Sequence, residues 1–293
     1  MRITQNKNRD VTLTQKAYSE RILEYFKMNH CALTSTPLPP GSLLSIDDCP
    51  TTSQETSEMA KTLYCEALEL LMWLQVATCP DLTYTMNILF RFSHNPGRSY
   101  WNALKHTLAY VKETIDYEIT YRGGGTLNPI GYVDSDYVGC KDTRRSTKGN
   151  VFIVAGRPVS WESKCQETVA LSIVESEYMT FTRVIAQALW IMKFFTEIGL
   201  PVTNPITIYT DNNRSISNST NDKNHHRTKH IDVKFHFVKE HMKKREIMFI
   251  YILSLDNLAD LFTKSLSHEM IRKLATAMDL NPKVQVILVQ REC

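Results

Sequence analysis

Four acidic residues in the second half of the chain have types and positions suited to metal-dependent chemistry. Asp134 and Asp211 directly follow apolar stretches typical of buried strands, and Glu177 and Asp260 lie near the starts of predicted helices. Unpaired carboxylates are costly to move out of water, so a cluster of them requires cations. Two Mg²⁺ ions, or Mn²⁺ in their place, would neutralise the cluster and promote cleavage of a phosphodiester bond. The pattern therefore predicts a two-metal nuclease site.

The order of the predicted elements explains how these acids could meet. In an open α/β sheet, ligands bind beyond the carboxyl ends of parallel strands, where the strand order reverses. If the strands at residues 130–133 and 206–210 are adjacent and parallel, Asp134 and Asp211 emerge at the same edge. Helices that begin beside this edge would bring the other two acids within reach of the same ions.

Neighbouring acids leave alternatives open at three places. Asp136 lies two residues after the first acid and shares its strand face. Glu175 and Glu177 lie about 200° apart on a helix, so only one can face the site, and alignment with apolar positions favours Glu177. Asp256 shares a helix face with Asp260, although it could instead cap the start of that helix.

The composition of the 293-residue chain narrows the class of protein. An apolar content of 43% supports ordinary globular cores, and a net charge of +3 is too small to establish a polyanionic partner. Neither a signal segment nor an apolar run of about 18 residues is evident, so we expect an intracellular protein, cytoplasmic or nuclear, with no membrane partner. Seven scattered cysteines indicate reduced thiols. The glycine turn at 123–125 is not followed by the start of a helix, so it lacks the pattern of a phosphate-binding loop. We expect no small-molecule cofactor.

The N-terminal third is predicted to be mostly α-helical. A Pro/Ser/Thr-rich stretch at 34–57 is typical of an extended linker or of a loop wrapped over a surface. Proline and glycine breaks separate the other segments. The predicted helices cover residues 13–28, 58–77, 81–92 and 99–112.

The pattern changes at residue 117, after which short strands precede alternating helices and strands. We predict strands at 117–121, 130–134, 150–155, 158–161, 206–210 and 247–253, and helices at 172–198, 230–245 and from 257. This order favours a mixed sheet covered on both faces. The predicted domains are residues 1–116 and 117–280, followed by a tail at 281–293.

Several motifs in the chain match a known family. In the second half they are YVDSDYVG (132–139), RRST (144–147), VSWESK (159–164), ESEY (175–178), YTDN (209–212), KHID (229–232) and ADLFTK (259–264). In the first half they are MWL (72–74), TCPD (78–81), NPG (95–97) and YW (100–101). Over about residues 11–280, the chain resembles the end of the Pol polyprotein of copia-type long-terminal-repeat retrotransposons. That end comprises the last part of the reverse transcriptase and its ribonuclease H domain.

The resemblance implies a fold, a reaction and a partner. The fold would be a ribonuclease-H-like five-stranded mixed sheet, preceded by a thumb and connection segment. Asp134, Glu177, Asp211 and Asp260 would be both the catalytic residues and the metal ligands. The reaction would be two-metal hydrolysis of the RNA strand of an RNA–DNA hybrid. The polymerase palm is absent, so the remainder of a reverse transcriptase is a second expected partner. A silent nucleic-acid-binding remnant and a fragment active only with that partner are the alternatives.

Basic residues supply candidate contacts to the substrate. Residues 222–245 are rich in Lys, Arg and His, and phosphate contacts from such a stretch would give salt-dependent binding. His230 and Lys234, one turn apart, are the predicted contacts, with a solvated helix face as the alternative. Arg144 and Arg145, in the turn after the first acidic strand, could contact the hybrid backbone or simply be exposed.

Two tryptophans are predicted to serve packing, not base stacking. Trp161 alternates with Val159 at a strand end and is predicted to be in a core. Trp190, with Leu189, Phe194 and Phe195, is predicted to lie on the buried face of the long helix.

Overall fold

A five-stranded mixed sheet is the centre of the fold in the computed structural model, which describes residues 1–200, 202–220 and 229–282. Its strand order is β6-β5-β4-β7-β8. The strands are β4 (Ile130–Asp136), β5 (Thr147–Val154), β6 (Arg157–Cys165), β7 (Ile206–Thr210) and β8 (Ile247–Tyr251). β4, β5 and β6 are antiparallel neighbours, whereas β7 and β8 run parallel to β4. The predicted adjacency of the two acidic strands is thus confirmed.

Side chains alternate between the two faces of this sheet, and each face has its own core. Phe152 and Ile208 pack on one face against the long helix α6. Val151, the neighbour of Phe152 in β5, packs on the opposite face against Phe262 and Leu274. The first face is covered by α6 (Ile173–Glu197), α7 (Asn213–Thr220) and α8 (Lys229–Lys243). The second is covered by η4 (Leu258–Phe262), which follows η3 (Ser254–Asp256), and by α9 (His268–Ala277).

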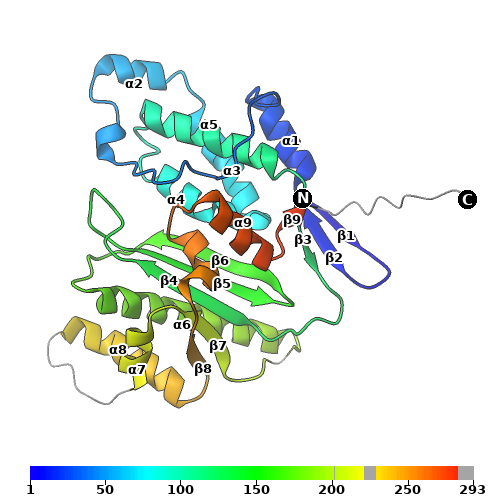
Figure 1. The fold of residues 1–293 in the computed structure, drawn as a ribbon, viewed down its shortest axis with the longest axis vertical. Coiled ribbons are helices and arrows are strands. Elements are labelled where there is room, and N and C mark those ends of the chain that lie inside the picture. Colours follow the sequence, from blue (N-terminus) through cyan, green and yellow to red (C-terminus); the bar gives the residue numbers. More distant parts are fainter. Residues whose placement is uncertain (201, 221–228, 283–293) are drawn as a thin grey trace, which may run out of the picture.

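The N-terminal third is mostly helical, as predicted, and lies on the same side of the five-stranded sheet as α9 (Figure 1). Its elements are α1 (Lys16–Tyr25), η1 (Ile46–Asp48), α2 (Ser53–Met59), α3 (Tyr64–Ala77), η2 (Pro80–Leu82), α4 (Thr83–Phe90) and α5 (Arg98–Glu113). A core of leucines, including Leu68, Leu71 and Leu104, holds these helices together. The predicted helix at 58–77 is two helices, and α2 begins earlier because Thr52 and Glu55 form a capping box.

A small second sheet was not predicted. It has the order β1-β2-β3-β9 and consists of β1 (Arg2–Gln5), β2 (Val11–Thr14), β3 (Tyr117–Tyr121) and β9 (Asn281–Pro282). The predicted helix at 13–28 is wrong at its start, because residues 11–14 pair with β1 and β3. β3 forms as predicted, but it pairs with β2 and β9, not with a strand of the five-stranded sheet. The domain boundary after residue 116 stays a prediction.

Two alternatives were predicted for the Pro/Ser/Thr-rich stretch at 34–57, a linker and a loop wrapped over a surface. The structure shows the wrapped loop. Leu38 is buried in the helical core. The Thr107 hydroxyl donates to the Pro37 carbonyl (3.0 Å), and the Tyr100 hydroxyl donates to the Ser45 carbonyl (3.2 Å), so the loop is fixed to α5.

The prediction for Trp190 and Phe194 is wrong. Their exposed fractions are 58% and 44%, and their rings stack on each other with centroids 5.5 Å apart. Residues of α6 after Ile191 are mostly exposed, whereas Leu189 and Phe195 are half-buried and pack against the first core of the sheet. Trp161 is half-buried and packs against the second core of the sheet. Among the described helices, none is both long and apolar enough to cross a membrane.

Candidate metal centre

Two parallel strands place Asp134 and Asp211 side by side. Tyr132 of β4 is in register with Tyr209 of β7, and each acid lies two residues further along its strand. Asp134 is buried, while Asp211 follows the last residue of β7 and is half-buried. The Ser254 hydroxyl donates to Asp211 Oδ2. The edge expected from the strand order is therefore the one at which the two carboxylates meet.

Asp260 comes from a 3₁₀ helix, η4, in place of the start of an α-helix. This helix lies directly on β5: a Cβ atom on Gly149 would be 2.7 Å from both Phe262 Cβ and Thr263 Cγ2. Gly149 is the cross-strand partner of Asp134, so the close approach brings η4 to the acid. The Asn257 amide donates to the Val133 carbonyl (3.1 Å) and fixes the start of η4 to β4.

Glu177 lies in the first turns of α6, which are fixed to β4. The hydroxyls of Ser135 and Ser176 form a hydrogen bond between strand and helix. The Gln166 amide donates to the Ser176 carbonyl (2.9 Å) and to the Thr180 hydroxyl (3.1 Å). Glu177 is 3% exposed, and its Oε2 has no hydrogen-bond partner among the residues that the structure describes. An unpartnered carboxylate oxygen at this depth indicates a place for a cation.

The structure brings three of the four predicted acids to metal-ligand spacing. One carboxylate oxygen from each of Asp134, Asp211 and Asp260 lies within 4.8 Å of the others. Glu177 is outside that set but adjoins it, because the charges of Asp134 and Asp211 act on its carboxyl group. A set of carboxylate oxygens without nitrogen or sulfur donors suits a hard divalent cation.

Burial and mutual repulsion oppose ionisation of these acids. Burial, and next the charge of Asp134, raise the pKa of Glu177 to about 8. The same two causes, in the same order, raise the pKa of Asp260 to about 7. The positive charge of Lys264 acts in the opposite direction on both pKa values and lowers them. Its Nζ lies 2.9 Å from Asp260 Oδ1 and 3.3 Å from Asp134 Oδ2. The cluster has more negative groups than this one ammonium can neutralise.

The alternative acids have other surroundings. The Glu175 carboxylate accepts from the Leu171 backbone amide (2.7 Å) just before α6. Asp256 is exposed within η3 and pairs with Lys273 (2.7 Å). Asp136 is half-buried beside the cluster, and burial followed by the Asp134 charge raises its pKa.

The predicted substrate residues remain apart from the acids. Arg144 and Arg145 are exposed in the turn between β4 and β5, where the Cys140 amide donates to the Arg145 carbonyl (3.1 Å). Lys234 is half-buried on α8, and the side chain of His230 lies outside the described residues. Among the described residues, no hydrogen bond or ion pair joins Arg144, Arg145 or Lys234 to the cluster. Their role in substrate binding stays a prediction.

Three residues at the cluster were missed in the sequence. Besides Ser254 and Lys264, the Thr263 hydroxyl contacts the site by donating to Asp134 Oδ2. Lys264 follows Asp260 by four residues, a spacing at which opposite charges pair on a helix, and this spacing could have identified it.

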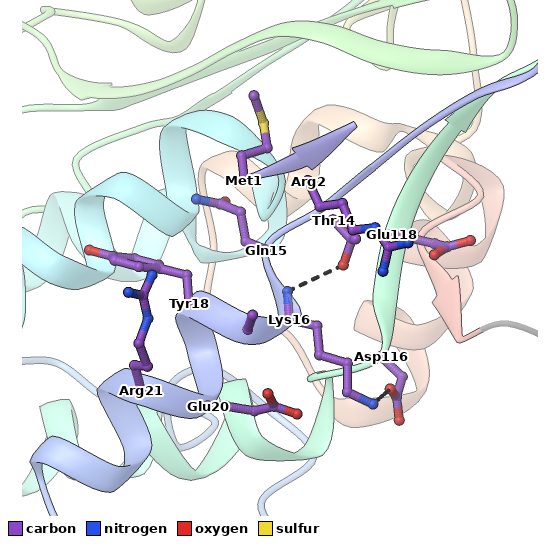
Figure 2. Close-up of a pocket in the computed structure, with 11 residues that line it drawn as sticks. Met1, Arg2, Thr14, Gln15, Lys16, Tyr18, Glu20, Arg21, Asp116 and Glu118 are labelled. Carbon is purple, nitrogen blue, oxygen red and sulfur yellow. Dashed lines mark hydrogen bonds and ion pairs between the residues drawn. The ribbon is translucent and has the colours of Figure 1, made fainter. Parts of the chain in front are cut away.

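A hollow elsewhere in the molecule has different chemistry. It has a volume of about 850 Å³ and lies beside β1 and α1, where Lys16 pairs with Asp116 (2.6 Å) (Figure 2). Its lining mixes cations such as Arg2 with anions such as Glu118, and none of the four predicted acids belongs to it. A lining of mixed sign does not favour a metal ion, so the acidic cluster is the candidate site.

Sequence comparison shows what the chain is related to. No protein-family model matches it. It is 36% identical over 264 residues to the retrovirus-related Pol polyprotein from transposon TNT 1-94 of Nicotiana tabacum, covering 89% of this chain and 20% of the relative. It is 31% identical over 264 residues to the Pol polyprotein from transposon RE1 of Arabidopsis thaliana, covering 90% of this chain and 18% of the relative. The chain belongs to the Pol polyprotein family of copia-type retrotransposons.

This Pol chain spans about a fifth or less of the length of those relatives. A solved structure with a similar arrangement is the N-terminal RNase H domain of a Mycobacterium tuberculosis protein. The similarity covers 52% of this chain and 99% of that one, with 8% identity and a TM-score of 0.34. The predicted architecture, a mixed five-stranded sheet with helices on both faces, is confirmed by the strand order and the packing of the helices.

Proposed function

We propose that this Pol chain is a metal-dependent endoribonuclease of the RNase H type, which hydrolyses the RNA strand of RNA–DNA hybrids. The observation that carries the proposal is the set of three aspartate oxygens within 4.8 Å, beside a buried Glu177 oxygen that has no partner in the described part of the chain. Membership of the Pol family supports a nucleic acid as the substrate. The hybrid itself is an inference from the likeness to the RNase H part of such polyproteins.

The residues present fit Mg²⁺ or Mn²⁺. Asp134, Asp211 and Asp260 would be the first ligands, and Glu177 would complete the set on the side of α6. When bound, two such ions would activate a water molecule and stabilise the leaving 3′ oxygen of the RNA. Cations at this position would also favour the ionised forms of Glu177 and Asp260, whose pKa values are raised in their absence.

The protein's own groups would orient the ligands. Ser254 and Thr263 each donate to one carboxylate oxygen, on Asp211 and Asp134 respectively, which leaves the other oxygen of each acid for a cation. Such outer hydrogen bonds fix the direction of a ligand and support its affinity. Selectivity for RNA would depend on contacts to 2′-hydroxyls across the minor groove of the hybrid.

The test is cleavage of a hybrid labelled separately on each strand, with Mg²⁺ and then Mn²⁺. We expect the RNA strand alone to be cut, and Asp211→Asn to reduce the rate by roughly a hundredfold or more, because a metal ligand is lost. Asp116→Asn makes the same chemical change at an exposed acid paired with Lys16, and should leave the rate unchanged. Absence of cutting by folded protein with either ion would refute the activity of the isolated chain.

The similarity to Pol polyproteins supports one second candidate. In this candidate the same centre acts only when a polymerase partner holds the hybrid. Adding a separately produced reverse transcriptase palm to the inactive protein distinguishes the two. Recovery of cutting that remains sensitive to Asp211→Asn would support the partner-dependent form, whereas salt-dependent binding without cutting would indicate a silent remnant.

A further inference from the structure

Lys264 places a positive charge inside the acidic cluster. Its Nζ lies 2.9 Å from Asp260 Oδ1 and 3.3 Å from Asp134 Oδ2, so the ammonium bridges two of the three clustered acids. The position follows from η4, because Lys264 lies one turn beyond Asp260 and its backbone amide donates to the Asp260 carbonyl (3.2 Å). The side chain is 34% exposed, so its outer part faces solvent.

The cluster depends on this lysine for neutralisation. Within residues 1–200, 202–220 and 229–282, Asp134 and Asp260 form ion pairs with Lys264 alone. Asp211 has the Ser254 hydroxyl as its donor, and Glu177 has the Asn212 side chain. Neutral donors of this kind orient a carboxylate but do not cancel its charge.

A divalent ion would compete with the ammonium for the same two carboxylates. Asp134 and Asp260 belong to the set of clustered acids, and both contact Lys264. Like charges a few ångströms apart in a partly buried site repel strongly. A lysine has a flexible four-carbon stem, and a side chain one-third exposed can rotate its charge into water.

We propose that Lys264 is an internal competitor of the metal, which occupies the acidic cluster in the metal-free protein and leaves it when a divalent ion binds. The proposal rests on the proposed function, since it concerns the same centre. Lys264 would stabilise the four acids before metal arrives and would lower the apparent affinity for metal. Metal binding would then be coupled to movement of one side chain at the mouth of the site.

The first test compares Lys264→Met with Lys273→Met in the full chain. Methionine keeps most of the aliphatic stem and removes the charge in both variants. Lys273 pairs with Asp256 (2.7 Å), outside the cluster, and is the matched control. Calorimetric titration with Mn²⁺ and with Mg²⁺ should give about a tenfold lower Kd for Lys264→Met, and an unchanged Kd for Lys273→Met. In EDTA, Lys264→Met alone should have a clearly lower thermal midpoint.

The second test uses the wild-type protein, and so does not depend on the folding of a variant. Brief acetylation of amines, read by mass spectrometry of peptides, reports how accessible each lysine is. Saturating Mn²⁺ should increase labelling of Lys264 several-fold and leave Lys273 unchanged. A Lys264 that remains on the acids would show no increase.

The outcomes separate this inference from the proposed function. Hybrid cleavage together with equal metal affinity in wild type and Lys264→Met would overturn the inference alone. Weaker metal binding by Lys264→Met would also overturn it, because the lysine would then assist the metal. Absence of saturable Mn²⁺ or Mg²⁺ binding in every variant would overturn the inference and the proposed function together.

Discussion

Glu177 is the carboxyl group whose surroundings most oppose ionisation in the metal-free protein. It is 3% exposed, and burial, followed by the charge of Asp134, raises its pKa to about 8 from 4.5. The folded state therefore holds a proton that the unfolded state has released between these pH values. The corresponding stability is fully present below about pH 4.5 and is lost as the pH rises through about 8. An ion on the cluster would reverse this effect by favouring the charged form.

Glu177→Gln should make the metal-free protein less sensitive to pH. In EDTA, we expect its thermal midpoint to exceed that of wild type by a few degrees above pH 8, and the difference to vanish near pH 4.5, because glutamine cannot ionise. Mn²⁺ affinity should fall, because a ligand is lost. Glu197→Gln changes an exposed glutamate at the other end of α6 and is the control. A midpoint difference that does not depend on pH would contradict the assignment.

At the scale of the element, the fit between η4 and β5 decides where Asp260 lies. Gly149 has no Cβ, and the atoms that a Cβ would meet belong to Phe262 and Thr263 at 2.7 Å and to the Ala259 carbonyl at 3.1 Å. These are core and backbone atoms that cannot move aside separately. A side chain at position 149 would therefore push the whole of η4 away from the strand that carries Asp134.

Gly149→Ala should weaken both metal binding and the fold. We expect an approximately tenfold loss of Mn²⁺ affinity, because Asp260 moves relative to Asp134, and a stability loss of about 1–3 kcal/mol from overpacking. Titration calorimetry and urea unfolding measure the two quantities. Gly131→Ala is the control: its Cβ would lie 3.0 Å from Phe152 Cε1 and 3.1 Å from Ile208 Cγ1, away from η4. Equal losses of affinity in both variants would show that general destabilisation is responsible.

At the scale of the whole molecule, the N-terminal helices and the five-stranded sheet form direct contacts. The Trp161 indole donates to the Gln75 carbonyl (3.1 Å), and the Asn87 amide donates to the Ser163 hydroxyl (3.1 Å). Both bonds join α3 or α4 to β6, on the side of the sheet nearer the N-terminal helices (Figure 1). The helical part therefore supports the sheet that carries the acids.

Trp161→Phe should reduce the free energy of unfolding by about 1 kcal/mol or slightly more, because the Gln75 carbonyl loses its donor while the aromatic packing is largely kept. Trp190→Phe is the matched control, since Trp190 is 58% exposed and its substitution should change stability by less than about 0.5 kcal/mol. Urea unfolding followed by circular dichroism checks both. Equal effects of the two substitutions would argue against the interface contact.

The sequence alone predicted the features that depend on residues close together along the chain. The apolar strands that precede Asp134 and Asp211, the helices of the N-terminal third and the motifs of the Pol family are local patterns, because strand and helix periods repeat within a few residues. The preference for Glu177 over Glu175 also followed from helix geometry. In the structure, burial and then the charges of Asp134 and Asp211 raise the pKa of Glu177.

The tertiary structure alone decided the contacts between distant segments. Residues 11–14 form the middle strand between the nearby β1 and β3, and β3 lies more than 100 residues later in the chain. Trp190 is exposed, although its spacing is that of a buried position. The ammonium of Lys264 reaches Asp134 only because η4 packs on Gly149, a close approach that no local pattern encodes. Types of residue predicted the chemistry of the centre, whereas packing across the sheet determined which groups meet there.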